Sequence, residues 1–487
     1  MSFLQRELNC FSDLLSLHHA MPERYPFLLE SISHASQSGA QQRWDILFAF
    51  PEQCLELTDN GLKVDGDAIS GNDFLGQLDV FWKQLALPSG QSIDLPFTGG
   101  WFLYLGYELA SQIEAKLIFK NATCQSESLA MAVRCPAAIL RDHKRGRLVI
   151  VAEQGHKEYL DIMQKDINEL TRNMGDSLAE SPQVQIDELK EDTPEVFLKS
   201  VNNIKQYIKA GDVFQVNLSR KWTGVVSDNT SAAMLYKVLR KKNPAPFSGL
   251  CRFSDWSIIS SSPERLVAVD RFRNIQSRPI AGTHPRSQHS PDDIEASNLL
   301  LQHPKEKAEH IMLIDLERND LGRVCRPGTI KVDELMVLES YAHVHHIVSN
   351  IKGELRDSVT PGDVIRAVFP GGTITGCPKV RCMEIIIELE QDARGPYTGS
   401  MGYLNRDGSL DLNILIRSFS LKNNLLCLRA GAGIVYDSIP TRELAETRAK
   451  ALGLLLALGK TENEIRKELR WSDDVNQRQN HDTDRCA

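Results

Sequence analysis

The segment Gly399-Ser-Met-Gly-Tyr-Leu404, then Asn405-Arg-Asp-Gly408, then Leu410-Asp-Leu-Asn-Ile-Leu-Ile-Arg-Ser418 decides the fold class of this chain. The two apolar stretches have the length and composition of β-strands, and the residues between them are typical of a tight hairpin turn. A third such stretch, Leu425–Ala430, follows after a short polar break. Successive strands joined by tight turns pair antiparallel, so the segment predicts an antiparallel sheet.

Short strands and helices are also predicted on both sides of this segment. Further strands are predicted at residues 213–218, 256–260 and 265–269. Helices are predicted at residues 292–302, 305–316, 361–368, 378–389 and 441–457. Strands and helices alternate irregularly, without a repeating β-α-β unit, and we therefore predict an α+β fold in which helices pack outside antiparallel sheets.

Composition shifts divide the chain into an N-terminal region at residues 1–175, a larger region at 195–460 and a polar tail at 472–487. The stretch 175–194 is rich in Ser, Asp, Glu and Pro and has no apolar period, which predicts a linker. An amphipathic helix is predicted directly after it, at residues 196–209, and Gly211 is expected to end that helix. We find no internal repeat.

The composition excludes several classes of protein. The chain has 487 residues, of which 42% are hydrophobic and 25% charged, and its net charge of -8 includes no long basic run. Nucleic acid is therefore not expected as the main partner. The ten cysteines show no CxxC pair and no metal-ligand spacing, which is typical of free thiols in a reducing compartment. No apolar stretch has the length of a signal peptide or a membrane span, so we expect a cytoplasmic protein that does not bind membranes.

Two acidic clusters share one spacing. Glu306 and Glu309 lie three residues apart, as do Glu443 and Glu446, and each pair falls in a predicted helix. Residues at this spacing share one helix face, so two such helices that faced each other would gather four carboxylates. Gathered carboxylates need a hard cation such as Mg²⁺. For either cluster taken alone, the alternative interpretation is a solvated helix face.

Three other motifs do not fit the functions that they superficially suggest. The run from Gly371 to Lys379 fails the phosphate-loop pattern, because Cys377 and Pro378 displace the lysine and no Ser or Thr follows it. Gly431-Ala432-Gly433 follows a strand but lacks the third glycine of a dinucleotide fingerprint. His343-Val-His345-His346 is a single tract without a second ligand cluster, so a closed zinc site is not expected.

Taken together, the motifs between residues 195 and 455 resemble the chorismate-binding enzyme family, and they stand in the order found in that family. The matching segments are Gly211 to Leu218, Ser262 to Glu264, Pro279 to Thr283, Pro304 to Val324, His343 to Ser349, Phe369 to Lys379, Arg417, Gly431 to Gly433 and Glu443 to Lys450. The resemblance implies two large antiparallel sheets layered with helices.

The resemblance also implies a binding site for chorismate, a dicarboxylate with a ring hydroxyl that must leave. Glu309 and Glu446 would hold Mg²⁺ directly, and Glu306 and Glu443 would support it through water. The bound Mg²⁺ would clamp the ring carboxylate and withdraw charge from it.

Further residues would bind the rest of the substrate. By the same resemblance, the other anionic group would be held by Tyr397, Arg417, Lys450 and the backbone amides of Gly431, Ala432 and Gly433. Thr373 and His346 would line the ring, and Thr283 would belong to the same catalytic set. Glu264 would protonate the departing hydroxyl, which requires a carboxyl that its surroundings keep protonated.

Position 215 separates the branches of this family. Relatives that add water to the ring carry a lysine there as general base, whereas Gln215 cannot abstract a proton. The chain therefore resembles the branch that adds ammonia, and we expect a heterodimer in which a glutamine amidotransferase subunit supplies it. The chain itself shows no cysteine in the Gly-rich elbow of a glutaminase.

Two activities remain within the ammonia branch. The motifs QVNL at 215–218, SPER at 262–265 and PGGTITGCPK at 370–379 resemble the 4-amino-4-deoxychorismate synthases of folate synthesis. Ala281 instead resembles the anthranilate synthases, because many folate enzymes carry at that position a lysine proposed to attack ring C2. Without that lysine, either ammonia attacks C4 directly or another nucleophile substitutes.

Two more segments resemble the tryptophan pocket of anthranilate synthases. They contribute Leu29, Glu30 and Ser31, and Asn243, Pro244, Pro246 and Phe247. Their alternative interpretation is a buried strand and a turn. A different class of function is a non-catalytic sensor that binds tryptophan or chorismate, but it predicts erosion of the catalytic set, which is intact in this sequence.

Overall fold

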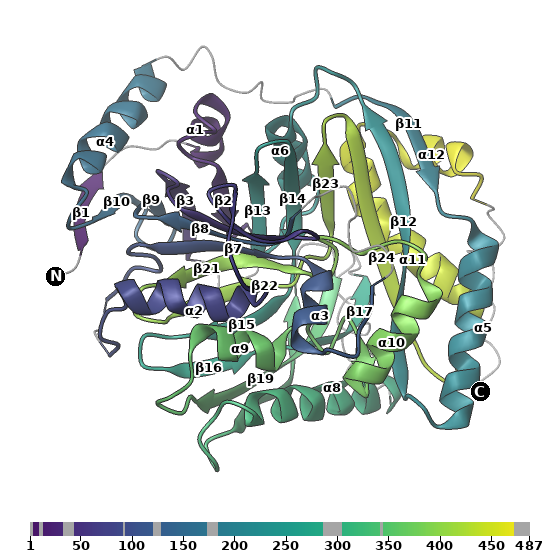
Figure 1. Ribbon diagram of the computed structural model, residues 1–487. Helices are drawn as coiled ribbons and strands as arrows, with labels where there is room; N and C mark the ends of the chain where they lie inside the picture. The colour runs from purple at the N-terminus through teal and green to yellow at the C-terminus, as the bar shows by residue number, and fades with distance from the viewer. Residues whose placement is uncertain are drawn as a thin grey trace.

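The computed structural model describes residues 3–8, 13–32, 43–90, 93–119, 128–172, 184–285, 304–340 and 344–471. Within these residues the chain forms two twelve-stranded sheets, called sheet A and sheet B below (Figure 1). The strand pairs that build both sheets are antiparallel. The predicted α+β fold class of layered antiparallel sheets with helices is confirmed.

Sheet A runs from an N-terminal edge to the segment that contains Gln215. Its strands, in spatial order, are β1 (Phe3–Leu8), β10 (Arg147–Glu153), β9 (Ala137–Asp142), β3 (Trp44–Ala49), β2 (Phe27–Glu30), β13 (Phe247–Arg252), β14 (Trp256–Ser262), β23 (Ser418–Lys422), β24 (Leu425–Ile434), β12 (Gln215–Val226) and β11 (Ile186–Glu191), with β20 (Gly376–Cys377) also paired to β12.

Sheet B is built in the same way. Its strands, in spatial order, are β17 (Ile280–Pro285), β19 (Val344–Glu354), β16 (Asn274–Ser277), β15 (Arg265–Val269), β22 (Leu410–Asn413), β21 (Ser400–Asn405), β7 (Gly100–Leu105), β8 (Ser128–Cys135), β4 (Cys54–Thr58), β5 (Gly61–Val64) and β6 (Asp67–Ala68), with β18 (Lys331–Ser340) also paired to β19.

Helices cover the two sheets. They are α1 (Leu14–Ala20), α2 (Phe74–Leu85), α3 (Ala110–Ile113), α4 (Lys157–Arg172), α5 (Pro194–Ala210), α6 (Ala232–Lys242), α8 (Pro304–Gly322), α9 (Pro361–Val368), α10 (Lys379–Leu389), α11 (Pro440–Leu455) and α12 (Glu462–Glu468), together with the short 3₁₀ turns Tyr107–Leu109 and Leu456–Leu458. In Figure 1, α1 and α4 lie above the strands at the left and α8 runs along the bottom, below the strands of sheet B.

The hydrophobic core is divided into layers. Between the sheets, Phe27 of β2 stacks on Phe102 of β7 with ring centroids 4.1 Å apart. A second cluster packs sheet A against α1, α4, α6 and α11. A third packs sheet B against α2, α8 and α9 and continues into α5, α10, β12 and β24. These helices therefore bury apolar residues against the sheets, as expected of a layered α+β fold.

The segment that decides the fold class forms the predicted hairpin, since β21 pairs with β22 and Gly408 adopts φ +85° in the turn between them. The predicted strand at 410–418 is wrong in one respect. The strand in this segment, β22, ends at Asn413, and the chain then leaves sheet B and enters sheet A at β23, which begins at Ser418. Arg417 lies in this link with a left-handed φ of +53°, which interrupts the extended backbone.

Four other predictions need comment. The predicted linker at 175–194 contains β11, whose Ile186 and Leu189 are buried while charged residues between them face solvent. The strand predicted at 425–430 continues to Ile434, so the Gly431–Gly433 segment is part of β24. The helix predicted at 292–302 and the tail at 472–487 lie outside the described residues.

The N-terminal and C-terminal regions share both sheets. In sheet A, β2 of the N-terminal region pairs with β13, and in sheet B, β7 pairs with β21. Residues 1–175 thus extend both sheets of the larger region.

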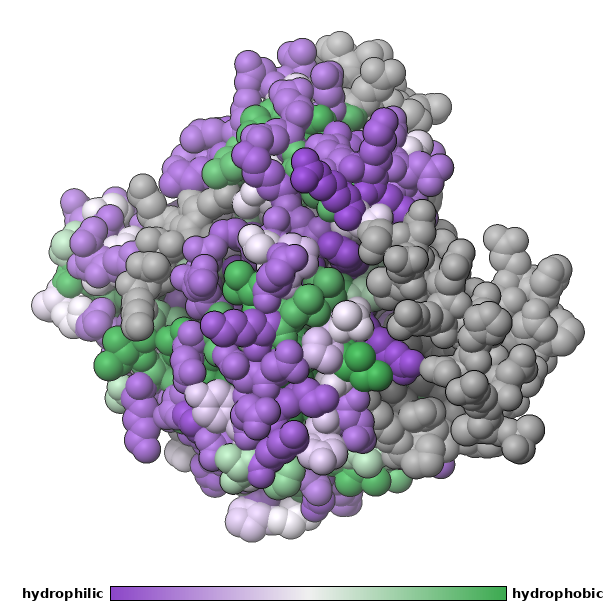
Figure 2. All heavy atoms as spheres, turned by 90° about the vertical axis from the view of Figure 1, so that its right-hand side faces the viewer, coloured by the Kyte–Doolittle hydropathy of each residue, from purple (hydrophilic) through white to green (hydrophobic). Residues whose placement is uncertain are grey.

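The outer surface on the side of α5 and α12 is mainly hydrophilic, with hydrophobic atoms gathered in a few smaller areas (Figure 2). Among the described helices, none combines the length and apolar character needed to cross a membrane.

Candidate active site

Two links between the sheets carry two of the predicted site residues. β14 belongs to sheet A and β15 to sheet B, and Glu264 lies in the link between them; Arg417 lies in the link from β22 to β23. The Ile414 amide donates to the Glu264 carbonyl at 3.0 Å, and the Ser261 amide donates to the Arg417 carbonyl at 3.1 Å. The two links therefore run side by side and bring Glu264 and Arg417 into the same part of the molecule.

Glu264 is a buried carboxyl, with 5% of its surface exposed. Burial raises the pKa of Glu264 to about 7, and the charge of Glu317 adds to the rise, while Thr373, the Ile280 amide and Lys450 lower it. Although Thr373 is near enough to affect this pKa, Thr373 Oγ1 and Glu264 Oε1 are both buried without a hydrogen bond among the described residues. A carboxyl with these properties can hold a proton at neutral pH and donate it.

Gln215 begins β12 and lies against the glycine segment of β24. A Cβ atom on Gly433 would come within 2.4 Å of Gln215 Nε2, so a side chain there would displace the glutamine amide, and it would lie in ordinary contact with Glu309 Oε1 at 3.6 Å. Gln215 Nε2 donates to Glu309 Oε1 at 2.7 Å, whereas Gln215 Oε1 is buried and has no hydrogen-bond partner among the described residues. A buried amide oxygen without a donor is a site at which a ligand N–H gains a hydrogen bond.

Gly431, at the other end of the glycine segment, contacts two further predicted residues. A Cβ atom on Gly431 would lie 2.8 Å from Tyr397 Oη, which shows how closely the tyrosine approaches the backbone. Lys450 Nζ donates to the Gly431 carbonyl at 3.0 Å and forms an ion pair with Glu446 at 2.6 Å. Ala432, between the two glycines, is fully buried in the core.

The backbone of this segment has one unpaired edge. β24 pairs with β12 as far as Ile434, but its pairing with β23 ends at Leu428. Among the described strands, none pairs with the remaining residues of β24 on that edge. Backbone amides on such an edge are available to a ligand anion.

Arg417 has no ion pair among the described residues, although it is half-buried. Burial lowers its pKa, and the neighbouring Tyr397 partly opposes this change. Burial also raises the pKa of the Tyr397 hydroxyl to about 12, so this group stays a neutral donor. A guanidinium removed from water without a carboxylate partner favours the binding of an anion.

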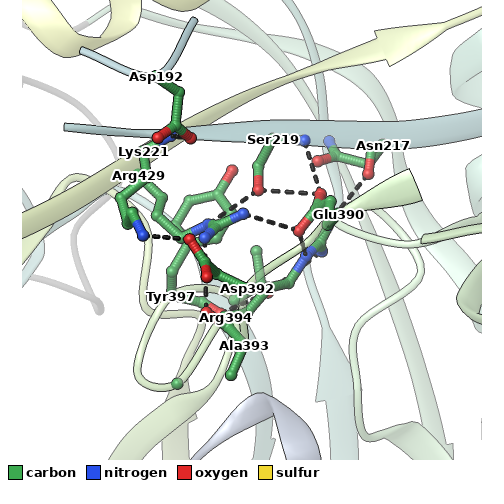
Figure 3. A network of polar contacts seen from close by, with 12 residues as sticks. Asp192, Asn217, Ser219, Lys221, Glu390, Asp392, Ala393, Arg394, Tyr397 and Arg429 are labelled. Atoms are coloured by element: carbon green, nitrogen blue, oxygen red, sulfur yellow. Dashed lines mark hydrogen bonds and ion pairs between the residues drawn. The ribbon is translucent and has the colours of Figure 1, made fainter. Parts of the chain in front are cut away.

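A buried polar network lies beside Tyr397 (Figure 3). Its centre is Glu390, which accepts two hydrogen bonds from Arg394, at 2.9 and 2.7 Å, and one from Arg429 at 3.0 Å. The Ser219 amide and hydroxyl also donate to Glu390, at 2.8 and 2.9 Å. The Arg394 guanidinium lies 5.7 Å from the centre of the Tyr397 ring. Sequence reasoning missed this network, although a Glu and an Arg four residues apart are one available signal.

The predicted metal ligands come from two helices. Glu309 of α8 is half-buried against Gln215, and Glu443 of α11 is buried. Glu446 is paired with Lys450. No three carboxylate, histidine or cysteine side chains of the described part lie close enough together to hold a metal ion, and the Glu306 side chain is outside that part. The carboxylate oxygens of the predicted ligands suit Mg²⁺, because this ion takes one or two carboxylates and completes its shell with water and substrate oxygens.

The remaining predicted site residues belong to sheet B. His346 is buried on β19, and its backbone pairs with that of Thr283 on β17. The backbone of Ala281 pairs with that of Ile347 in the same ladder. The side chains of Thr283 and Ala281 lie outside the described part of the chain.

A separate cavity of about 310 Å³ lies between the sheets and contains most of the predicted tryptophan pocket. Of the predicted residues, the lining includes Leu29, Glu30, Ser31, Pro246 and Phe247. Asn243 and Pro244 do not line it, because they lie in the turn after α6, where Asn243 Nδ2 donates to Ser261 Oγ at 2.6 Å.

Charged residues around this cavity are paired. Glu30 bonds to Tyr236 at 2.7 Å and to Arg240 at 2.9 Å. Arg265 forms two 2.9 Å bonds to Asp411 and lies 5.0 Å from the centre of the Phe247 ring. The cavity is therefore bordered by neutralised ion pairs and apolar groups, in contrast to the uncompensated Arg417.

Comparisons with known proteins show which family the chain is similar to. Residues 37–455 match the family model described as chorismate binding enzyme. The chain is 39% identical to aminodeoxychorismate synthase component 1 of Bacillus subtilis over 76% of this chain and 79% of that protein. It is 36% identical to anthranilate synthase component 1 of Thermus thermophilus over 89% and 92% of the two chains. The crystal structure of anthranilate synthase component I from Streptococcus pneumoniae superposes with a TM-score of 0.74 at 30% identity, covering 86% of this chain and 93% of that one.

Proposed function

Because the chain belongs to the chorismate-binding enzyme family, we propose that it transfers ammonia to chorismate and forms 4-amino-4-deoxychorismate, the precursor of 4-aminobenzoate in folate synthesis. The observation that carries this proposal is the Gln215 side chain, whose Oε1 is buried without a partner beside Glu309 and Gly433. An amide oxygen accepts an N–H but cannot remove a proton from water. This favours amination over hydration.

In the proposed reaction, a nitrogen–carbon bond forms at ring C4 and the C4–oxygen bond breaks. Glu264 gives its proton to the departing hydroxyl, which leaves as water, and the attacking nitrogen loses one proton. A carboxyl whose pKa is about 7 is suited to this transfer, because it is still protonated near neutral pH. The Thr373 hydroxyl beside Glu264 would contact the ring or the leaving group.

The anionic group of the substrate that does not bind the metal would be held by residues around the glycine segment of β24. Arg417 offers an uncompensated guanidinium and Tyr397 a neutral hydroxyl, and Lys450 offers an ammonium at the Gly431 carbonyl. The unpaired edge of β24 adds backbone amides. This combination suits a carboxylate, which accepts several donors at once.

Mg²⁺ would be held by Glu309 and Glu446, with Glu306 and Glu443 in support, and when bound it supplies a Lewis acid for the ring carboxylate. In the described structure, Gln215 and Lys450 occupy oxygens of Glu309 and Glu446. Glu309 and Glu446 would thus exchange these partners for the metal when the site is filled.

We further propose a heterodimer with a glutamine amidotransferase subunit, which would release ammonia for this site. Ammonia is protonated in bulk water, and an enclosed passage between the subunits would keep it nucleophilic. The protein would be cytoplasmic, as expected for an enzyme of soluble intermediates.

Anthranilate synthase component I is the second candidate. The observation that favours it is Ala281, which stands where many folate enzymes carry lysine. The cavity at Leu29, Glu30 and Phe247 would then hold tryptophan. Against it stand the three motifs at 215–218, 262–265 and 370–379. Arg265 of the second motif borders the cavity and pairs with Asp411.

Product identification tests the proposal. The protein is incubated with chorismate, Mg²⁺ and ammonium, and the product is examined before and after addition of a lyase specific for 4-amino-4-deoxychorismate. A product that yields 4-aminobenzoate only after the lyase supports C4 amination, and release of anthranilate without the lyase contradicts it. Absence of any amine would favour the non-catalytic sensor.

A further inference from the structure

Asn217 of β12 carries a buried side-chain oxygen that lacks a hydrogen bond. Among the described residues, none donates to Asn217 Oδ1. The backbone of Asn217 is held on both sides, because its amide donates to the Thr375 carbonyl at 2.9 Å and its carbonyl accepts from Arg394 Nη2 at 2.8 Å (Figure 3). The direction in which the side chain projects is therefore set, and its oxygen is an acceptor that a ligand can use.

A second oxygen of the same kind projects from the same face of β12. Gln215 and Asn217 are two residues apart on this strand, so their side chains lie on one side of sheet A. Gln215 Nε2 donates to Glu309, and Gln215 Oε1 is buried without a donor among the described residues. Ser219 follows on the same face, but its hydroxyl is already bonded to Glu390 at 2.9 Å. The two unpartnered amide oxygens are thus neighbours on the strand.

Both amides lie against the glycine segment of β24. A Cβ atom on Gly431 would come within 2.8 Å of Asn217 Oδ1 and also within 2.8 Å of Tyr397 Oη. A Cβ atom on Gly433 would come within 2.4 Å of Gln215 Nε2. Since Tyr397 belongs to the predicted substrate-binding set, Asn217 Oδ1 lies in the candidate active site.

The two oxygens require a ligand that donates more than one hydrogen bond. Chorismate is a dicarboxylate, and its ring hydroxyl is its one donor at neutral pH. In the proposed reaction that hydroxyl leaves with a proton from Glu264, and the carboxylates of chorismate can only accept hydrogen bonds. Ammonia has three N–H groups and is the reactant that supplies the missing donors.

We propose that Asn217 is an ammonia-binding residue, whose Oδ1 acts together with Gln215 Oε1 as a pair of acceptors. Ammonia donates one N–H to each oxygen, and its third N–H and its lone pair stay free. The lone pair forms the new bond to the ring carbon. The inference rests on the proposed function, in which ammonia is the nucleophile.

The Asn217→Leu variant tests this role through the KM values of the two reactants. Leucine keeps the size of the side chain but offers no acceptor. Consumption of chorismate by the full chain is measured at one pH and one total salt concentration, with ammonium varied and then with chorismate varied. We expect KM for ammonium to rise about five- to tenfold, as for loss of one hydrogen bond, and KM for chorismate to stay within about twofold. An unmoved KM for ammonium, or an equal rise in both values, would overturn the proposal.

Asn350→Leu is the matched control. Asn350 Oδ1 is also buried without a hydrogen-bond partner among the described residues, but Asn350 lies on β19 of sheet B, where its Nδ2 donates to Asp333 at 2.7 Å. This variant should keep the wild-type KM for ammonium. A rise equal to that of Asn217→Leu would show a general effect of losing a buried amide and would overturn the proposal.

Asn217→Ser is the second test if Asn217→Leu does not fold. The serine hydroxyl is too short to reach the position of Oδ1, so KM for ammonium should rise in this variant also. An unchanged value would contradict the proposal.

Product identity separates this proposal from the proposed function, because consumption of chorismate does not depend on which ring carbon receives the nitrogen. If anthranilate forms, C4 amination is refuted, and a higher KM for ammonium in Asn217→Leu still supports the pair of acceptors. If 4-amino-4-deoxychorismate forms and this KM is unmoved, the pair of acceptors is refuted and C4 amination stands. Wild-type protein that consumes no chorismate in the presence of ammonium would contradict both.

Discussion

Glu264 shows how one buried side chain links stability to the proposed chemistry. Its pKa is raised from 4.5 to about 7 by burial, so the folded state binds its proton more tightly than the unfolded chain does. The folded state is therefore most favoured below about pH 4.5, and this contribution is lost as the pH rises through about 7. The difference corresponds to about 3 kcal/mol.

The Glu264→Gln substitution should separate the two effects. We expect turnover to fall by about 10²- to 10⁴-fold, as for loss of a general acid. At about pH 8 the variant should unfold with a free energy up to about 3 kcal/mol higher than the wild type, because it carries no buried charge, and near pH 4.5 the two should be similar. Denaturant unfolding at both pH values measures this. A variant less stable than the wild type by the same amount at both would contradict the burial argument.

The metal assignment is tested at Glu309 and Glu446. Exchange of either for Gln keeps the shape but removes a charged ligand, and we expect Mg²⁺ affinity to fall by at least about tenfold with loss of turnover. Calorimetric titration with Mg²⁺ measures the affinity directly. Glu188→Gln, at an exposed residue paired with Lys190 on β11, is the control and should bind Mg²⁺ like the wild type. Unchanged affinity in both ligand variants would refute the assignment.

The sequence identifies individual site residues, but it does not identify the residues that hold them in place. Glu264 and Gln215 can be predicted because each stands in a recognisable motif. Glu390 and Arg394 escaped notice, since a polar segment after a helix is typical of an exposed turn. Their burial depends on Arg429, which is distant in sequence and is brought there by the pairing of β24 with β12.

The end of α5 shows how a single glycine affects the stability of a helix. Gly211 ends the helix at φ +83°, and a Cβ atom added there would meet nothing within 4 Å. Gly211→Ala should therefore destabilise the protein by about 1 kcal/mol through backbone strain alone. Gly155→Ala is the control, because Gly155 also has free space and no left-handed φ, and it should change stability by less than about 0.5 kcal/mol. Equal unfolding midpoints for both variants would contradict this explanation.

Elements with a clear local period were predicted well, as for α9 at residues 361–368 and β15 at residues 265–269. Errors arose where tertiary structure overrides the local pattern. The strand predicted at 410–418 runs past the end of β22 at Asn413, because Ile414, Leu415 and Ile416 are also apolar, and the change from sheet B to sheet A has no signal in the local sequence. β11 was missed because an edge strand can carry many charges on its exposed face.

The whole molecule is held together by strands from both halves of the chain. The division at residues 175 and 195 follows composition, which carries no information on long-range strand pairing. The contacts of β2 with β13 and of β7 with β21 unite the two regions in both sheets. The ring pair Phe27–Phe102 further ties the sheets together within the N-terminal region.

A fragment of residues 195–460 should therefore not fold alone. It would expose the edges of β13 and β21 and the apolar surface between the sheets, which favours aggregation. We expect no cooperative thermal transition and no near-UV circular dichroism signal, in contrast to the full chain under the same conditions. A cooperative transition with a native-like spectrum would show that the fragment is an independent domain.

The central claim, that this chain aminates chorismate at C4, is tested most directly by the position of the new nitrogen. The full chain is incubated with chorismate, Mg²⁺ and nitrogen-15-labelled ammonium in the absence of any lyase, and the product is examined by NMR. We predict labelled nitrogen on ring C4 with the enolpyruvyl group still attached. Labelled nitrogen on C2 of anthranilate, together with free pyruvate, would contradict the account.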